Sequence, residues 1–322
     1  PALAAVRRQA LNPATDSPLH QALVKLFDNP DAAPSERLAA AALAAPTLQS
    51  LSDQQFAQLT STLLNEASPS IDRTAAADAL AAAPLTVEQL SKLVAVVPAA
   101  GPLELNKLVS AFIKGNDAAT GVALLDALAQ SPALPSLRID LLRQALLNYD
   151  AAVTDRIAAV EALVNVDAAT QRSRIEELLP SMASGDVRRG HAVFNGAKAS
   201  CSACHRMGYG GGVTGPELSK IGEIRTERDL LESILFPSMS FVRSYEPMLL
   251  VTSDGRAVSG VIRNETEHEY IVATGPNEEV RLPRDAVEEV QPNTISIMPA
   301  GLDKQLTVQE LADLVAFLKN AK

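Results

Sequence analysis

The sequence predicts a mainly α-helical protein in two parts. The first part, residues 1–180, is an expected α-solenoid, because it is rich in Ala and Leu, interrupted by Pro, and lacks an alternating strand pattern. The second part, residues 181–322, is expected to be a small helical domain, because apolar residues recur in it at helical spacing. Within it, the apolar period switches to two over residues 240–292, which predicts a small antiparallel β insertion.

Composition limits the possible partners. Apolar residues make up 47% of the chain, but the sequence contains no run of 18 or more apolar residues, the length that a membrane-spanning helix needs. The net charge of −10 argues against nucleic acid and anionic membranes, and it favours basic or neutral protein partners. The opening "PALAAVRRQALNP" lacks a basic region followed by an apolar one, which is expected of a processed chain or an excised fragment.

A weak internal repeat organises the first part. "ERLAAAALAAPTLQSLSDQQF" begins at Glu36, and "DRTAAADALAAAPLTVEQL" begins at Asp72, 36 residues later. Each predicts an apolar helix, a break at Pro, and a second helix with Ser52 or Thr86 as its N-cap. Paired helices at this period indicate HEAT-like repeats with a structural or docking role. His20, the only histidine in this part, is expected to be exposed near a helix start.

Three helices are predicted in the second part. "GDVRRGHAVF" has Asp186 as N-cap, "TERDLLESILFP" has Thr226, and "LTVQELADLVAFLKNAK" has Thr307 and Glu310 at capping-box spacing. Between the second and third helices, the sequence predicts four or five short strands. The segment "SDGR" predicts a tight turn at Asp254–Gly255.

The segment "CSACH", residues 201–205, contains the only two cysteines of the chain. A redox disulfide would expect a βαβ context, whereas this pair follows a short helix and leads into a glycine-rich loop. Structural zinc needs four ligands, so His205 and a distant histidine would have to complete the site. Covalent haem needs only what is present: Cys201 and Cys204 form thioethers, and His205 binds the iron. The motif is short, so its surroundings decide between these chemistries.

Those surroundings resemble a class I cytochrome c. "GHAVF" precedes the motif, "GPELSKIG" follows it, and "ELADLVAFL" closes the domain. The resemblance implies that the first and last helices cross closely, with a glycine permitting the contact and an aromatic ring packed into it. It also implies that the carbonyl of Pro216 accepts a hydrogen bond from His205, which would orient the ring. The residues at the crossing are Gly190, Phe194, Phe317 and Leu318.

A more specific resemblance is to the haem-binding domain family described from planctomycetes and verrucomicrobia. "GGVTGPEL", "LLESILFPS" and "SIMPAGLDKQLTVQELADLVAFL" occur here in the order of that family's pattern. The similarity covers about residues 185–322 and not the first part. Relatives often carry helical repeats and a dehydrogenase-like β-propeller upstream. The resemblance therefore implies one covalent haem c in an exported, periplasmic chain that serves a dehydrogenase.

A second axial ligand for the iron is expected from a methionine. Met298 precedes a proline in the loop before the last helix, where small cytochromes c place this ligand, and we expect it to bind the iron. Met239 is the alternative by distance along the chain, and a site without a methionine ligand stays open. Met207 follows His205 too closely to reach the opposite face. His191 is expected at the solvent edge, and His268 lies in an acidic hairpin; either could serve only a bis-histidine site.

His/Met ligation saturates the iron and suits one-electron transfer, so we expect an electron carrier rather than an enzyme. The alternative is a gas-binding or sensing module in which Met298 is labile. The β insertion looks like a small SH3- or Sm-type barrel, but five Arg and no Lys stand against ten acidic residues over 240–292, which disfavours nucleic acid. The insertion is expected to shield a haem edge or to dock a partner.

Overall fold

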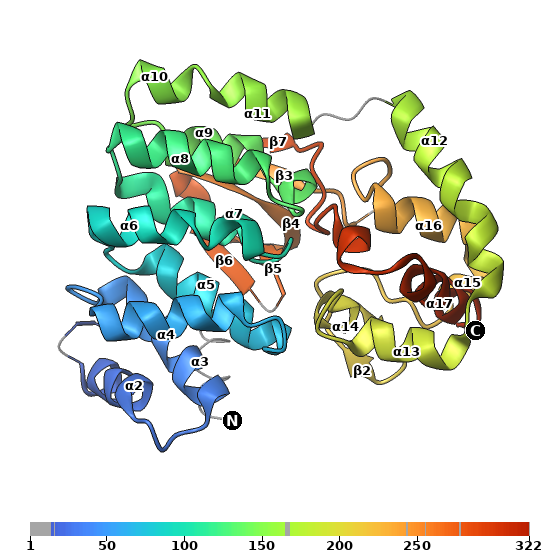
Figure 1. Ribbon diagram of the computed structural model, residues 1–322, viewed down its shortest axis with the longest axis horizontal. Coiled ribbons are helices and arrows are strands. Elements are labelled where there is room, and N and C mark those ends of the chain that lie inside the picture. Colours follow the sequence, from blue (N-terminus) through green and yellow to red (C-terminus); the bar gives the residue numbers. More distant parts are fainter. Residues whose placement is uncertain are drawn as a thin grey trace. The chain divides into compact units, whose positions relative to one another are not determined.

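The protein is mainly α-helical and carries a five-stranded antiparallel sheet (Figure 1). A second, two-stranded antiparallel pair joins β1 (Arg206–Met207) to β2 (Gly210–Gly211). This computed structural model describes residues 14–15, 17–164, 168–242, 244–254, 256–276 and 278–321. The chain divides into two compact units, residues 1–166 and 167–322, whereas the sequence suggested a boundary after residue 180. Within the described ranges, no helix is both long enough and apolar enough to cross a membrane.

The first unit is built from short helices joined by turns. Its α-helices are α2 (Pro18–Asp28), α3 (Pro34–Ala44), α4 (Asp53–Leu64), α5 (Ser70–Ala82), α6 (Val87–Val94), α7 (Leu105–Ser110), α8 (Ala118–Ala129), α9 (Ile139–Ala145), α10 (Ala151–Thr154) and α11 (Ile157–Val164). Its 3-10 helices are η1 (Ala45–Thr47), η2 (Val97–Ala99), η3 (Ala111–Lys114) and η4 (Leu134–Ser136). Alanines of α3 and α5 are fully buried where these helices pack, so the two backbones can approach closely.

Helices α3 and α5 each make an equivalent hydrogen bond from an arginine to the preceding helix. The Nε of Arg37 donates to the carbonyl of Phe27 at 2.9 Å, and Nη1 of Arg73 donates to the carbonyl of Leu63 at 2.7 Å. Each arginine thus binds the carbonyl ten residues before it, in the last turn of the preceding helix. A carbonyl there has no partner within its own helix, so the arginine satisfies it. The repeated contact supports the 36-residue repeat seen in the sequence.

The helix N-caps predicted for this unit are confirmed. The side chain of Ser52 accepts from the backbone N–H of Gln55, and that of Thr86 accepts from Gln89, both at 3.2 Å. The two glutamine side chains accept from the cap N–H groups in return, which completes two capping boxes.

The predicted position of His20 near a helix start is confirmed, but its predicted exposure was wrong. Its residue surface is only 8% exposed, and its Nδ1 lies 2.8 Å from Oγ1 of Thr47. Ser17 caps this helix by accepting from the N–H of His20. The ring turns inward because the Thr47 hydroxyl, 27 residues later, supplies its buried hydrogen-bond partner.

The second unit contains the candidate site. Its α-helices are α12 (Ala168–Leu178), α13 (Val187–Asn195), α14 (Cys201–Cys204), α15 (Ile221–Ile224), α16 (Glu227–Leu235) and α17 (Val308–Lys319), with 3-10 helices η5 (Leu179–Ser184), η6 (Arg284–Ala286) and η7 (Leu302–Gln305). Ile175, Leu178 and Met182 pack into the same buried cluster as the apolar faces of α13, α16 and α17. This packing explains why the unit begins before residue 181. Asp186, Thr226 and Thr307 cap their helices as predicted.

The β insertion is an antiparallel sheet in the order β6-β5-β4-β3-β7. Its strands are β3 (Met248–Thr252), β4 (Ala257–Glu265), β5 (Glu269–Gly275), β6 (Glu278–Pro283) and β7 (Val287–Pro292). Leu250, Tyr270, Val272 and Leu282 form its buried core. The first strand lies between the second and the last, so the module ends where it began: the N–H of Asn293 donates to the carbonyl of Pro247 at 2.8 Å. The turn predicted at Asp254–Gly255 includes Gly255, which lies outside the described residues.

Candidate functional site

The two cysteines lie on a single helical turn. Helix α14 spans Cys201–Cys204, and Ser200 enters it in the left-handed conformation, with φ 48°. Residues three apart on a helix share a face, so both thiols project from one side. Both thiols are free. The N–H of His205 donates to the carbonyl of Cys201 at 2.9 Å, which closes the turn and places the histidine directly beside the pair.

The His205 ring is fixed by the chain that follows it. Its Nδ1 lies 2.8 Å from the carbonyl oxygen of Pro216, the contact that the resemblance implied. A carbonyl can only accept, so Nδ1 carries the proton and Nε2 keeps its lone pair. Burial lowers the pKa of His205, which favours the neutral ring, although the bond to Pro216 opposes this shift. The ring therefore presents Nε2 as an available ligand atom.

The loop between His205 and Pro216 packs directly on the motif because two of its residues lack side chains. A β-carbon at residue 215 would lie 2.6 Å from Cε1 of His205, and one at residue 212 would lie 2.1 Å from the carbonyl oxygen of Ala203. The N–H of Gly215 donates to the carbonyl of Cys204 at 2.9 Å. The glycines thus allow the backbone to lie against the imidazole and hold it in place.

Burial also raises the pKa of the two thiols. It raises the pKa of Cys201 to about 11 and that of Cys204 to about 12, with further raising contributions at Cys204 from Cys201 and from the Glu278 carboxylate. Both groups are thiols at neutral pH. A redox-active or metal-binding cysteine needs the thiolate and has a lowered pKa, so this environment is the opposite of the one that a disulfide exchange site uses.

Met298 lies in the loop between β7 and η7. Its side chain is half-buried, and its N–H donates to Oγ of Ser296 at 3.1 Å. The N–H of Ser296 in turn donates to Oγ of Ser238 at 3.0 Å, which ties this loop to the end of α16. Met239 is 43% exposed. The described contacts do not join Met298 to the CSACH segment, so its role as a ligand stays a prediction.

The two histidines that could have served a bis-histidine site are both exposed. His191 packs its edge on Phe317, with ring centroids 5.4 Å apart, and its Nε2 lies 3.2 Å from Nδ2 of Asn195. The solvent-edge position predicted for His191 is confirmed. His268 lies at the turn between β4 and β5.

Helices α13 and α17 cross as the resemblance implied. A β-carbon at residue 190 would lie 1.9 Å from the carbonyl oxygen of Asp313, so only glycine fits at this contact. Beside it, the rings of Phe194 and Phe317 pack with centroids 5.5 Å apart, and Leu318 is buried. The crossing joins the helix before the motif to the last helix of the chain, and α14 packs against α13 (Figure 1).

An ion pair at the same crossing was missed in the sequence. Arg189 donates from Nε and Nη2 to the two carboxylate oxygens of Asp313, at 2.7 and 2.8 Å. Asp313 also accepts from the N–H of Asp186 at 2.8 Å, and its side chain is only 3% exposed. The bonds to Arg189, more than any other partner, lower the pKa of Asp313 to about 2. The signal available in the sequence was an acidic residue inside the apolar helix "ELADLVAFL".

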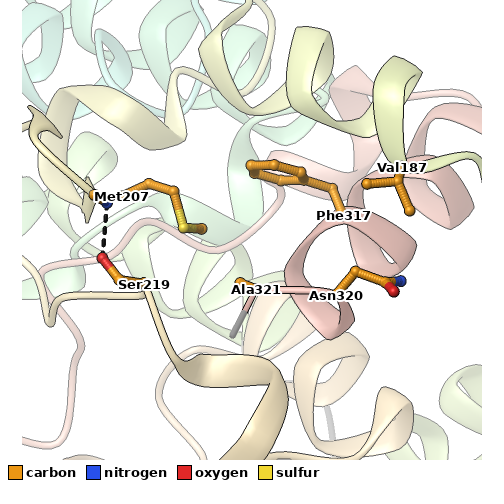
Figure 2. A pocket seen from close by; sticks show the side chains of 7 residues that line it. Val187, Met207, Ser219, Phe317, Asn320 and Ala321 are labelled. Atoms are coloured by element: carbon orange, nitrogen blue, oxygen red, sulfur yellow. Dashed lines mark hydrogen bonds between the residues drawn. The ribbon is translucent and has the colours of Figure 1, made fainter.

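A pocket of about 340 Å³ lies between the loop that follows the motif, the start of α13 and the end of α17. In Figure 2 the side chain of Met207 reaches toward it, with the ring of Phe317 opposite, and the dashed line joins the N–H of Gly208 to Oγ of Ser219 at 2.7 Å. Its lining is Val187, Met207, Gly208, Ser219, Phe317, Asn320 and Ala321. None of the candidate site residues is among them, and Met207 fills apolar space as a core methionine does.

In comparisons with known proteins, no family model and no curated sequence matches this chain. Over the described residues, no group of three or more His, Cys, Asp or Glu side chains lies close enough to hold a metal ion. The CSACH segment and the loop that fixes His205 are therefore the features that indicate a function.

Proposed function

We propose that residues 181–322 form a class I cytochrome c domain with one covalent haem c, and that this domain transfers single electrons. One observation carries the proposal. Two free thiols stand on one helical turn, and the histidine that follows commits Nδ1–H to the Pro216 carbonyl, which leaves Nε2 as a ligand atom. This combination is the donor set that haem c attachment requires.

The residues present fit the group chemically. Cys201 and Cys204 would hold it by thioethers. A thioether sulfur carries no charge, so it suits the buried position that raises the pKa of both thiols. His205 would bind the iron through Nε2. The Pro216 carbonyl would orient the ring and raise its basicity. When bound, the haem supplies an iron that changes its charge by one electron, and the protein's part is to hold, orient and shield it.

For the opposite face of the iron we propose Met298. Its half-buried position and its Ser-anchored loop support it over the exposed Met239. A neutral thioether opposite histidine raises the reduction potential, which suits an electron acceptor placed after a dehydrogenase. The net charge of −10 supports a basic or neutral acceptor protein. Haem c is attached on the periplasmic side, so we propose a periplasmic or otherwise exported protein.

For residues 1–180 we propose a HEAT-like solenoid that holds a partner or spaces the haem domain from one. The repeated arginine contacts of α3 and α5 support this proposal, because stacked repeats bury equivalent contacts at equivalent positions.

The test is expression of the full chain in a host that attaches haem c, followed by a denaturing gel stained for haem. We expect wild type to keep its haem in the gel, the variants C201S and C204S each to lose part of the attachment, and the double variant to lose all of it. S202A, on the same helical turn, is the matched control and should keep the haem. A wild-type chain that binds no covalent haem would overturn the proposal.

A second measurement separates electron transfer from gas sensing. An electron carrier should give a six-coordinate, low-spin ferrous spectrum that carbon monoxide does not change, and it should titrate with a single reversible one-electron midpoint. If wild type binds carbon monoxide rapidly, the proposed electron-transfer function is replaced by gas sensing.

A further inference from the structure

The β insertion touches the candidate site at two points. Nη1 of Arg263, on β4, donates to the carbonyl oxygen of Val213. Oγ1 of Thr214 donates to the carbonyl oxygen of Gly275, at the end of β5, at 3.3 Å. The two contacts therefore fall on adjacent residues of one loop, and Thr214 is 7% exposed.

Both contacts come from irregular positions in otherwise regular strands. The pairing of β4 with β5 shifts between Ile262 and Asn264, and Arg263 is the residue between them. The pairing of β5 with β6 shifts between Ala273 and Gly275, and Gly275 is the residue that follows the shift. A bulge redirects a side chain or a carbonyl away from the regular ladder and is typical of strands next to functional sites.

The loop segment held in this way is the one that fixes the histidine. Gly215 follows Thr214 and packs its backbone on the His205 ring, and Pro216 accepts the Nδ1–H bond at 2.8 Å. Only one residue separates Thr214 from Pro216. Gly215 is restrained by its close packing on the His205 ring and by its N–H bond to the carbonyl of Cys204, so we expect a displacement of residues 213–214 to move the Pro216 carbonyl as well.

We propose that the β insertion is a positioning element for His205: Arg263 and Thr214 hold the segment 213–216 so that its carbonyl keeps the imidazole in one orientation. The inference rests on the proposed function for its consequence, because the orientation and basicity of an axial histidine tune a haem iron. The module would then influence the reduction potential of the haem through His205. This role is additional to shielding a haem edge or docking a partner.

A further contact agrees with this placement. The carboxylate of Glu278, at the start of β6, contributes to raising the pKa of Cys204. A β-carbon at Gly275 would lie 2.7 Å from the Glu278 carboxylate, so this side chain folds over the turn that receives the Thr214 hydroxyl. The start of β6 therefore lies beside the turn that receives the Thr214 hydroxyl, and its carboxylate acts electrostatically on Cys204.

The first test uses the full chain without haem and measures amide hydrogen exchange. The probe is the N–H of Gly215, which is bonded to the carbonyl of Cys204 at 2.9 Å. T214V and R263M each remove one donor at little change in volume, and we expect exchange at Gly215 to become about tenfold faster in each. R281M is the matched control: Arg281 is another arginine of the module, paired with Glu269 at its surface, and its loss should leave Gly215 unchanged. Unchanged exchange in both T214V and R263M would overturn the proposal.

The second test uses the haem-loaded chain and measures the reduction midpoint. A loosened Nδ1–H bond makes the imidazole a weaker base, so we expect T214V and R263M to raise the midpoint while T214S, which keeps the hydroxyl, restores it. Equal midpoints in wild type and both variants would contradict the inference. If wild type attaches no haem, the proposed function fails, but exchange at Gly215 still decides whether the module holds the loop.

Discussion

Gly190 of α13 packs directly on the backbone carbonyl of Asp313 in α17. A β-carbon on residue 190 would lie 1.9 Å from the carbonyl oxygen of Asp313 and 2.6 Å from Cβ of Phe317. Both atoms belong to α17, whose inner face is buried, and they cannot move aside independently. The contact therefore fixes how near the first and last helices of this unit can lie.

We expect G190A to destabilise the second unit by about 3 kcal/mol, because one methyl group would force the two helices apart. G210A is the matched control, since a β-carbon there meets nothing within 4 Å and its φ is not positive. Its free energy of unfolding should change by less than about 0.5 kcal/mol. Chemical denaturation followed by circular dichroism measures both, and equal effects would contradict the close approach.

Asp313 makes the stability of this unit dependent on pH. Its pKa is about 2 in the folded protein, below its ordinary value of 3.8, so its contribution is complete above about pH 5 and is lost as the pH falls toward 2. We expect D313N to cost about 1–2 kcal/mol at pH 7, a figure reduced because Arg189 is 58% exposed. The difference from wild type should shrink steadily between pH 5 and pH 2. A difference that does not change with pH would show that the charge of Asp313 does not stabilise the crossing.

The assignment of Met298 predicts a spectroscopic change. M298A should lose the methionine–iron charge-transfer band of the ferric protein, lower the reduction midpoint and open the iron to carbon monoxide, because a ligand is removed. M239A, which alters an exposed methionine, should do none of these. Survival of the band in M298A together with its loss in M239A would transfer the ligand role to Met239.

The repeated arginines of the first unit carry a stability prediction. Arg73 donates to the carbonyls of Leu63 and Ala99 at 2.7 and 2.9 Å, so R73M should leave two helix-end carbonyls without this donor and cost about 2 kcal/mol. R156M removes only a surface pair with Asp126 and should cost less than about 0.5 kcal/mol. Thermal unfolding midpoints compare the two, and a smaller loss in R73M than in R156M would contradict a role for Arg73 in the helix stack.

Much of the architecture was predictable because its signals are local. Ser52, Thr86 and Thr307 cap helices through residues three positions later, and such contacts depend on the immediate sequence alone. The β insertion was visible from its alternating period for the same reason. The bond between His205 and Pro216 was reached only through a family resemblance, since spacing does not say which carbonyl a ring will meet.

The remaining features depend on residues far apart in the chain. His20 is buried because Thr47 lies 27 residues away and offers it a partner. The Arg189–Asp313 pair spans 124 residues, and no local period indicates such a pairing. The contact between Arg263 and Val213 needs a bulge, and one extra residue in a strand leaves no clear mark in its sequence.

The joined ends of the β module change how the chain can fold. Asn293 and Pro247 lie within one hydrogen bond, so a folded module brings together two points that are 46 residues apart in the sequence. The entropy lost on closing a loop grows with the length of free chain, and a module that folds early removes its own length from that loop. The entropy lost when α17 packs on α13 is then close to that of a chain in which a short turn replaces the insertion. The protein thus accommodates a sheet between its two crossing helices with little added cost in the conformational search.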